Sequence, residues 1–218
     1  MLESGEVEAS PEFIHLFEPA TGDSGRTLLL LHGTGGSERD LVPLAQALVP
    51  GAAILSPRGK VLEGGVAARF FRRHGEGVLD IEDLKVRTDE LAGFIRASAG
   101  SYGFDPARVT AIGFSNGANI ATALLFRHPD LLKGAALLRP MLPYVPEPAP
   151  DLSGKRVLVA IGEGDPMVPA EQPVELARLL TGCGAEVTTS TAPGAGHGLS
   201  QQDLEELRRW FGGADQAA

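Results

Sequence analysis

The chain has 218 residues, of which 43% are hydrophobic and 22% are charged, and its formal net charge is −9 at pH 7. This length is enough to bury the core of one domain, and the composition is ordinary for a soluble globular protein. Basic residues form no long cluster along the sequence, which argues against nucleic-acid binding, and the acidity is typical of a soluble surface.

The start of the chain and its single cysteine bear on the compartment. Residues 1–6 carry neither the basic region nor the apolar stretch of a signal peptide, and no apolar run approaches the roughly 20 residues of a membrane helix. Cys183 has no partner for an internal disulfide and lies in a Gly-flanked turn, where a structural thiol is expected. We therefore expect a cytoplasmic protein without membrane insertion.

Short apolar runs alternate with amphipathic stretches along the whole chain, while Gly and Pro stand at the ends of these runs. This alternation predicts an α/β fold with a mainly parallel, twisted sheet and helices on both faces. In chain order, the expected elements are a strand at 27–31, a helix at 40–48 with Ser37 as its cap, a strand at 52–55, a helix at 81–99, a strand at 109–112, a helix at 116–127, strands at 134–138 and 156–161, a helix at 170–180, a strand at 186–190 and a helix at 199–211.

Two stretches between these elements lack a clear period. Residues 56–80 are rich in Gly and Arg, and residues 139–154 are rich in Pro, so both are predicted to be irregular. No internal repeat or linker divides the chain. We expect a single domain over 1–218, with its core at about 12–212, frayed ends that include 212–218, and no large lid.

One pentapeptide carries a candidate nucleophile. Gly113-Phe114-Ser115-Asn116-Gly117 matches the G-x-S-x-G pattern, with an apolar strand before it and an amphipathic helix after it. In that context the serine sits on a strained strand-to-helix turn, and its hydroxyl projects at the carboxyl edge of the sheet, near the positive end of the helix dipole. The alternative is a Gly-rich turn in which Ser115 only caps the helix.

A serine hydroxyl needs a base to become a nucleophile. In the elbow-bearing fold the chain order is serine, acid, histidine, which leaves His128 and His197 among the five histidines. His128 ends the helix that starts at the elbow, so it is expected at the far end of that helix. His197 follows the last strand in a Gly-flanked loop, from which its ring can reach the serine; the alternative is an ordinary surface histidine.

The acid and the oxyanion donors are expected at the carboxyl edge of the sheet, beside the serine. Asp165 and Glu163 both follow the strand at 156–161, and either carboxylate could orient the imidazole. The backbone N–H of Asn116 is the expected first donor to an oxyanion, and Thr34 in His32-Gly33-Thr34-Gly35-Gly36 is the second. That Gly run lacks the phosphate-loop and dinucleotide fingerprints, and His32 is expected to be a buried structural residue.

With these pieces placed, the chain resembles the phospholipase/carboxylesterase family of small α/β-hydrolases, in particular its bacterial predicted-esterase branch. Many relatives have Gln where this chain has Asn116, and they often have Asp where it has Gly36. The matching stretches, which follow one another over most of the chain, are Leu31–Gly36, Ser56–Gly59, Arg69–Arg73, Asp80–Leu84, Gly113–Ala118, Gly162–Pro169 and Gly196–Leu199.

The resemblance implies a catalytic triad of Ser115, Asp165 and His197, and it favours Asp165 over Glu163. It also implies hydrolysis of short- to medium-chain carboxylic esters, and in some members cleavage of acyl-thioesters or lysophospholipids, without metal or organic cofactor. A non-catalytic small-molecule binder on a hydrolase scaffold is the alternative from another class. The sequence leaves a homodimer open.

Loops that follow the strands should line the substrate pocket, since ligands bind at the carboxyl edge of such sheets. Without a large lid, this pocket is expected to be open and shallow and to suit small soluble esters. The apolar candidates for its lining are Phe70, Phe71, Met141, Leu142, Tyr144, Met167, Val168 and Leu199.

Overall fold

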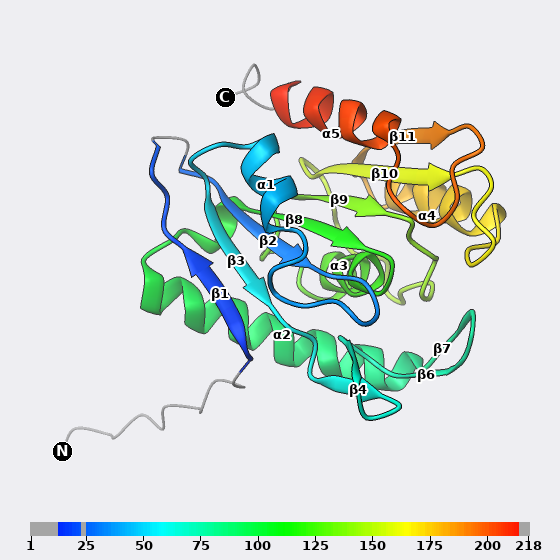
Figure 1. Cartoon of the computed structure of the whole chain (residues 1–218), viewed down its shortest axis with the longest axis horizontal. Helices are drawn as coiled ribbons and strands as arrows, with labels where there is room; N and C mark the ends of the chain where they lie inside the picture. The colour runs from blue at the N-terminus through cyan, green and yellow to red at the C-terminus, as the bar shows by residue number, and fades with distance from the viewer. Residues whose placement is uncertain (1–12, 23–24, 214–218) are drawn as a thin grey trace.

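The computed structural model describes residues 13–22 and 25–213 and is built around one large sheet (Figure 1). All neighbouring strands of this sheet are parallel except β1, which pairs antiparallel with β3 at one edge. The strands, in their order across the sheet, are β1 (His15–Glu18), β3 (Ala53–Pro57), β2 (Thr27–Leu31), β8 (Val109–Phe114), β9 (Gly134–Leu138), β10 (Arg156–Gly162) and β11 (Glu186–Ala192).

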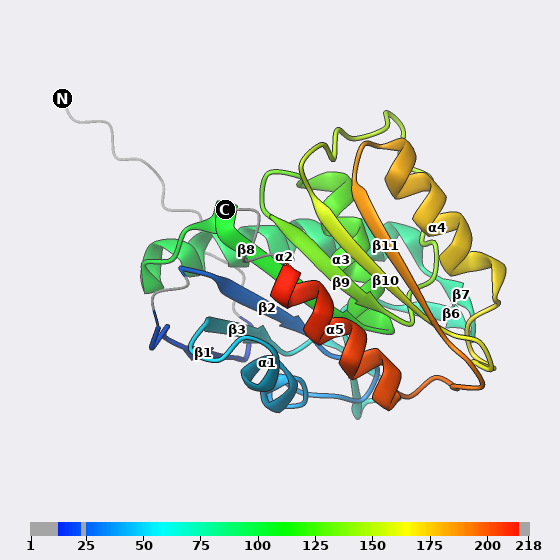
Figure 2. The same cartoon turned by 90° about the horizontal axis from the view of Figure 1, so that it is seen from above.

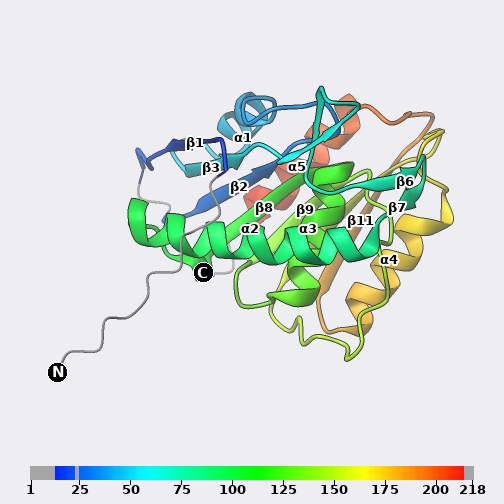
Figure 3. The same ribbon diagram turned by 90° about the horizontal axis from the view of Figure 1, so that it is seen from below.

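Helices cover both faces of the sheet (Figures 2 and 3). α1 (Val42–Leu48) and α5 (Gln201–Gly213) lie on one face, while α2 (Ile81–Tyr102), α3 (Asn116–Arg127) and α4 (Glu171–Gly182) lie on the other. Because strand side chains alternate, Leu28 and Leu30 of β2 join the core under α1 and α5, whereas Leu29 and Leu31 join the core under α2, α3 and α4. The central strands are buried on both faces, which explains their continuous apolar sequences.

The structure adds elements that the sequence pattern did not predict. The edge strand β1 falls in a stretch for which no element was expected. The predicted irregular stretch at 56–80 contains two small hairpins. The short 3₁₀ turn before β8, η1 (Pro106–Arg108), lies where the sequence Asp105-Pro106-Ala107-Arg108 does predict a turn. The hairpin strands are β4 (Val61–Glu63), β5 (Ala67–Arg69), β6 (Arg73–Gly75) and β7 (Val78–Leu79).

Several helix ends differ from the prediction. Leu41, not Ser37, caps α1, and the Ser37 hydroxyl instead donates to Asp40 Oδ1. α2 continues to Tyr102 and ends at Gly103, whose φ of 74° lies in the left-handed region that glycine tolerates. α5 continues to Gly213, so the prediction that Gly212 and Gly213 fray is wrong; the other residues expected to fray lie outside the described ranges.

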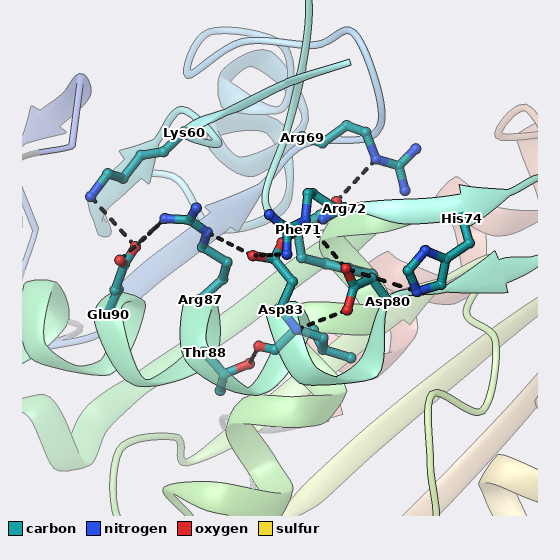
Figure 4. Close-up of polar contacts among 11 residues, drawn as sticks. Lys60, Arg69, Phe71, Arg72, His74, Asp80, Asp83, Arg87, Thr88 and Glu90 are labelled. Atoms are coloured by element: carbon teal, nitrogen blue, oxygen red, sulfur yellow. Dashed lines mark hydrogen bonds and ion pairs between the residues drawn. The ribbon is translucent and has the colours of Figure 1, made fainter. Parts of the chain in front are cut away.

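A network of charged side chains fastens the hairpin segment to α2 (Figure 4). The backbone N–H of Arg72 donates to Asp83 Oδ2 at 2.7 Å, and its Nε donates to Asp80 Oδ2 at 3.2 Å. Asp80 is also the N-cap of α2, where its side chain accepts from the Asp83 N–H. Arg69 extends from the segment away from α2, so the network holds this arginine over the carboxyl edge of the sheet.

Among the described residues, no helix is long and apolar enough to cross a membrane.

Candidate active site

Ser115 stands at the junction of β8 and α3, with φ of 52° and ψ of −112°. A non-glycine residue rarely adopts positive φ, so the turn is strained. The neighbouring glycines permit it: a Cβ on Gly117 would lie 1.9 Å from Leu31 O, and one on Gly113 would lie 2.5 Å from Gly117 O. The Ser115 N–H donates to Leu138 O at 2.8 Å, which fixes the elbow to β9.

Two short hydrogen bonds link Ser115, His197 and Asp165. His197 Nε2 lies 2.9 Å from Ser115 Oγ, and its Nδ1 lies 2.8 Å from Asp165 Oδ2. The other carboxylate oxygen, Asp165 Oδ1, accepts from the N–H groups of Met167 and Val168. These bonds orient the carboxylate toward the ring, and the ring in turn presents Nε2 to the serine.

Glu163, the other acid considered from the sequence, lies elsewhere. Its Oε2 accepts from the Gly194 N–H at 3.0 Å, near the end of β11. It therefore anchors the start of the loop that carries His197 and makes no hydrogen bond with the imidazole. His128 is likewise remote from Ser115: it ends α3 and pairs with Asp89 at 2.8 Å.

The two expected oxyanion donors flank the serine. Thr34 and Asn116 both line the cleft beside Ser115, and among the described residues neither backbone N–H has an acceptor. The Thr34 hydroxyl accepts from Arg69 Nη1 at 2.8 Å, while Arg69 Nε donates to Phe71 O. Arg69 is buried and paired with Glu63, so it holds the loop that bears Thr34 in place.

His32 is structural, as its sequence context predicted. Gly33 O accepts from His32 Nδ1 at 2.6 Å, and His32 Nε2 accepts from the Gly59 N–H at 3.0 Å. The ring must be neutral to make both bonds. Burial lowers the pKa of His32, which favours this neutral form.

A buried ion pair supports the loop that carries His197. Arg139 follows β9 with φ of 56°; it donates twice to Asp203, at 2.9 and 2.7 Å, and both side chains are 1% exposed or less. The same guanidinium donates to Gly196 O and Gly198 O, on either side of His197. Burial would raise the pKa of Asp203, but the hydrogen bonds from Arg139 and Ser200 outweigh it and hold that pKa below its usual value.

The cleft at Ser115 receives only some of the apolar residues that the sequence suggested. Met141, Met167 and Val168 line it. Phe70 and Phe71 lie in the core instead, because the hairpin segment turns their rings inward. Leu142 and Tyr144 pack against the same core, and Leu199 lies outside the cleft.

The sequence pattern did not indicate the polar residues that line the cleft. Its walls include Arg69, Arg73 and Glu76 of the hairpin segment, and also Asn119, whose Oδ1 accepts from the Met141 N–H. Arg139 could have been flagged as a charged residue directly after a buried strand. Asp203 could have been flagged by the capping pattern Ser200-x-x-Asp203, an acidic residue three positions after a serine. In the described ranges, no cluster of three or more His, Cys, Asp or Glu could hold a metal ion.

Comparisons with known proteins agree with this arrangement. The profile of the Dienelactone hydrolase family matches residues 82–218. MhqD of Bacillus subtilis is 46% identical over 197 residues, which cover 90% of this chain and 96% of MhqD.

Solved structures of two bacterial proteins superpose along most of the chain. The Bacillus cereus carboxylesterase has a TM-score of 0.88 and 44% identity, covering 92% of this chain and 93% of its own. A carboxylesterase from Mesorhizobium loti has a TM-score of 0.84 and 33% identity, covering 92% and 95%. The predicted α/β fold, with a mostly parallel sheet between two layers of helices, is thereby confirmed.

Proposed function

Because the chain belongs to the Dienelactone hydrolase family of small α/β-hydrolases and is a serine hydrolase, we propose that it cleaves short- to medium-chain carboxylic esters through an acyl-enzyme at Ser115. The family expected from the sequence motifs is thus confirmed. The observation that carries the proposal is the pair of hydrogen bonds joining Ser115 Oγ, His197 and Asp165, at 2.9 and 2.8 Å. The carboxylesterases among the similar structures support the choice of esters.

The first half of the reaction forms the acyl-enzyme. Ser115 Oγ attacks the ester carbonyl carbon while His197 Nε2 takes its proton. Asp165 keeps the remaining proton on Nδ1 and stabilises the imidazolium without accepting that proton. His197 then protonates the departing alcohol oxygen, and the C–O bond of the ester breaks.

The oxyanion is stabilised by donors that are already in place. The N–H groups of Thr34 and Asn116 have no acceptor among the described residues, so an oxyanion can accept from both. In the second half of the reaction, water attacks the acyl-enzyme with His197 as base, and the same donors hold the second tetrahedral oxyanion. The bond between the acyl carbon and Ser115 Oγ then breaks, His197 returns the proton to Oγ, and the carboxylic acid leaves. Loss of one such donor typically reduces kcat about 10²–10³-fold.

The cleft favours a compact acyl group. Its apolar lining consists of Leu79, Met141, Met167 and Val168, while Arg69, Arg73 and Glu76 add charged side chains to the lining. Met167 is 38% exposed, so the apolar lining opens to solvent. A long acyl chain would leave most of its length in water and gain little from the cleft.

The test is hydrolysis of p-nitrophenyl esters from acetate to palmitate, with matched acyl-thioesters run in parallel. We expect kcat/KM to be highest for the short and medium chains. Ser115→Ala should lose about 10⁴-fold or more in kcat, whereas Ser101→Ala, an exposed serine on α2, should match the wild type. Near-normal turnover by Ser115→Ala, or a preference for palmitate, would contradict the proposal.

A further inference from the structure

Asn119 is a buried polar side chain in the wall of the cleft that the proposed mechanism leaves unused. It lies on α3, one helical turn after Ser115, because its backbone N–H donates to Ser115 O at 3.0 Å. Only 5% of its surface is exposed, and it lines the same cleft as Ser115 and Met141. The polar atoms of so buried a side chain normally all have hydrogen-bond partners, so an open one needs a physical reason.

One hydrogen bond fixes how the Asn119 amide is turned. The Met141 N–H donates to it at 2.8 Å, so the atom facing that N–H is the oxygen, Oδ1, and the other atom is Nδ2. Nδ2 carries two N–H donors, and neither has an acceptor in the described part of the chain. Nδ2 is not sealed off either, in contrast to Asn116 Nδ2, which is buried without a partner. Since Asn119 reaches a surface at the cleft, its free donors face the cleft.

The charges of the cleft lining balance, so these donors suit a neutral oxygen better than an anion. Arg69 and Arg73 both pair with Glu63, and the exposed carboxylate of Glu76 is the second negative charge beside them. The remaining arginine of the lining, Arg139, has its own buried carboxylate partner. The lining therefore offers no excess positive charge that would attract a carboxylate group.

We propose that Asn119 is a specificity-determining residue whose Nδ2 donates to a neutral oxygen in the acyl group of the substrate. The enzyme then favours acyl groups with an ether, hydroxyl or keto oxygen near the ester carbonyl over plain hydrocarbon chains. This inference rests on the proposed function, in which Ser115 attacks that carbonyl.

The position of Asn119 accounts for the preference. One helical turn is about 5.4 Å, so an acyl group held at Ser115 reaches Asn119 within its first few atoms. The amide is also bonded to the backbone of Met141, whose side chain belongs to the apolar lining that receives the acyl group. A hydrocarbon chain would displace water from Nδ2 and leave its donors without an acceptor, which weakens binding of that chain.

Two esters of the same shape test this role. p-Nitrophenyl methoxyacetate and p-nitrophenyl butyrate differ only by an ether oxygen in place of one methylene group of the acyl chain. The quantity to measure is the ratio of their kcat/KM values. The intrinsic reactivity of each ester is the same for every variant, so it cancels when ratios are compared between variants. Both esters share one leaving group, so the comparison reports on the acyl group alone.

Asn119→Asp keeps the acceptor for the Met141 N–H but replaces the donor Nδ2 with a carboxylate oxygen. We expect the ratio of methoxyacetate to butyrate to fall about fivefold relative to the wild type. Asn119→Ala removes the donor without adding a charge and should lower the ratio to a similar extent. Thr122→Val is the matched control: it removes a buried hydroxyl from the same helix, outside the cleft lining, and should leave the ratio unchanged.

Equal ratios for the wild type and the two Asn119 variants, each with a cooperative thermal transition, would overturn this role and leave the proposed esterase activity standing. A fall in the ratio for Thr122→Val as large as that for Asn119→Asp would overturn it as well, because the effect would then not come from the cleft. If the wild type hydrolyses neither ester, or if Ser115→Ala hydrolyses both as fast, the proposed function fails and this inference fails with it.

Discussion

Replacing Asp203 with Asn removes the charge that compensates buried Arg139. The Asp203 carboxylate accepts four hydrogen bonds, two from Arg139 and two from the N–H and hydroxyl of Ser200. An amide keeps the shape but turns one acceptor into a donor, and it leaves a guanidinium that is 1% exposed without its counter-charge. Removal of one partner of a buried pair costs about 3–5 kcal/mol.

For a chain of this size, that loss should lower Tm by roughly 6–20 °C in a thermal scan. Activity should fall as well, because the same guanidinium holds Gly196 O and Gly198 O beside His197. We expect kcat on p-nitrophenyl butyrate to drop at a temperature where the variant is still folded. Ser200→Ala is the matched control, since it removes only the two hydrogen bonds of the hydroxyl, one donated to Asp203 Oδ2 and one accepted from the Asp203 N–H, and should cost about 1–2 kcal/mol. A Tm for Asp203→Asn within 2 °C of that for Ser200→Ala would refute this reasoning.

We make three further predictions, for Gly117 at the elbow, for the contact of Arg69 with Thr34 and for buried His32. Gly117→Ala places a Cβ 1.9 Å from Leu31 O, so the elbow must open, and we expect a loss of about 3 kcal/mol or more in urea unfolding. Arg69→Lys keeps the charge but cannot donate to Thr34 Oγ1 and Phe71 O at the same time. We expect kcat/KM to fall about tenfold, and an unchanged value would exclude a role of Arg69 in positioning the Thr34 loop. Because burial lowers the pKa of His32, the unfolded chain binds a proton at higher pH than the folded chain does. The contribution of neutral His32 to stability is therefore complete above pH of about 6.5 and is lost as the pH falls toward the lower pKa of the folded chain. Urea midpoints between pH 8 and 5 should therefore fall less steeply for His32→Asn than for the wild type, and equal slopes would contradict the assignment.

The sequence predicted best the helices and strands whose burial gives a distinct pattern of apolar residues. β2 and β9 are buried throughout and read as continuous apolar runs. β1 was missed because it has four half-buried residues at the sheet edge. The hairpins at β4–β7 were missed because ion pairs with α2 hold them, and such pairs leave no period in the sequence.

The candidate site likewise contains residues that the sequence predicts and residues that it does not. Ser115 and His197 could be named in advance because each follows a predicted strand, and parallel strands end at one edge of the sheet. Asp165 and Glu163 share that position, and the family resemblance decided between them. Arg139 and Asp203 are 64 residues apart and join a loop to a helix, so local patterns can point to each residue but not to their pairing.

We propose that Ser115 is the nucleophile and that His197 activates it. The most direct measurement is labelling of the full chain with a fluorophosphonate, followed by peptide mass spectrometry. One label should appear on Ser115 in the wild type, Ser115→Ala should take up none, and His197→Ala should label far more slowly. A label on another residue, or equal labelling of the wild type and Ser115→Ala, would show that Ser115 is not the nucleophile.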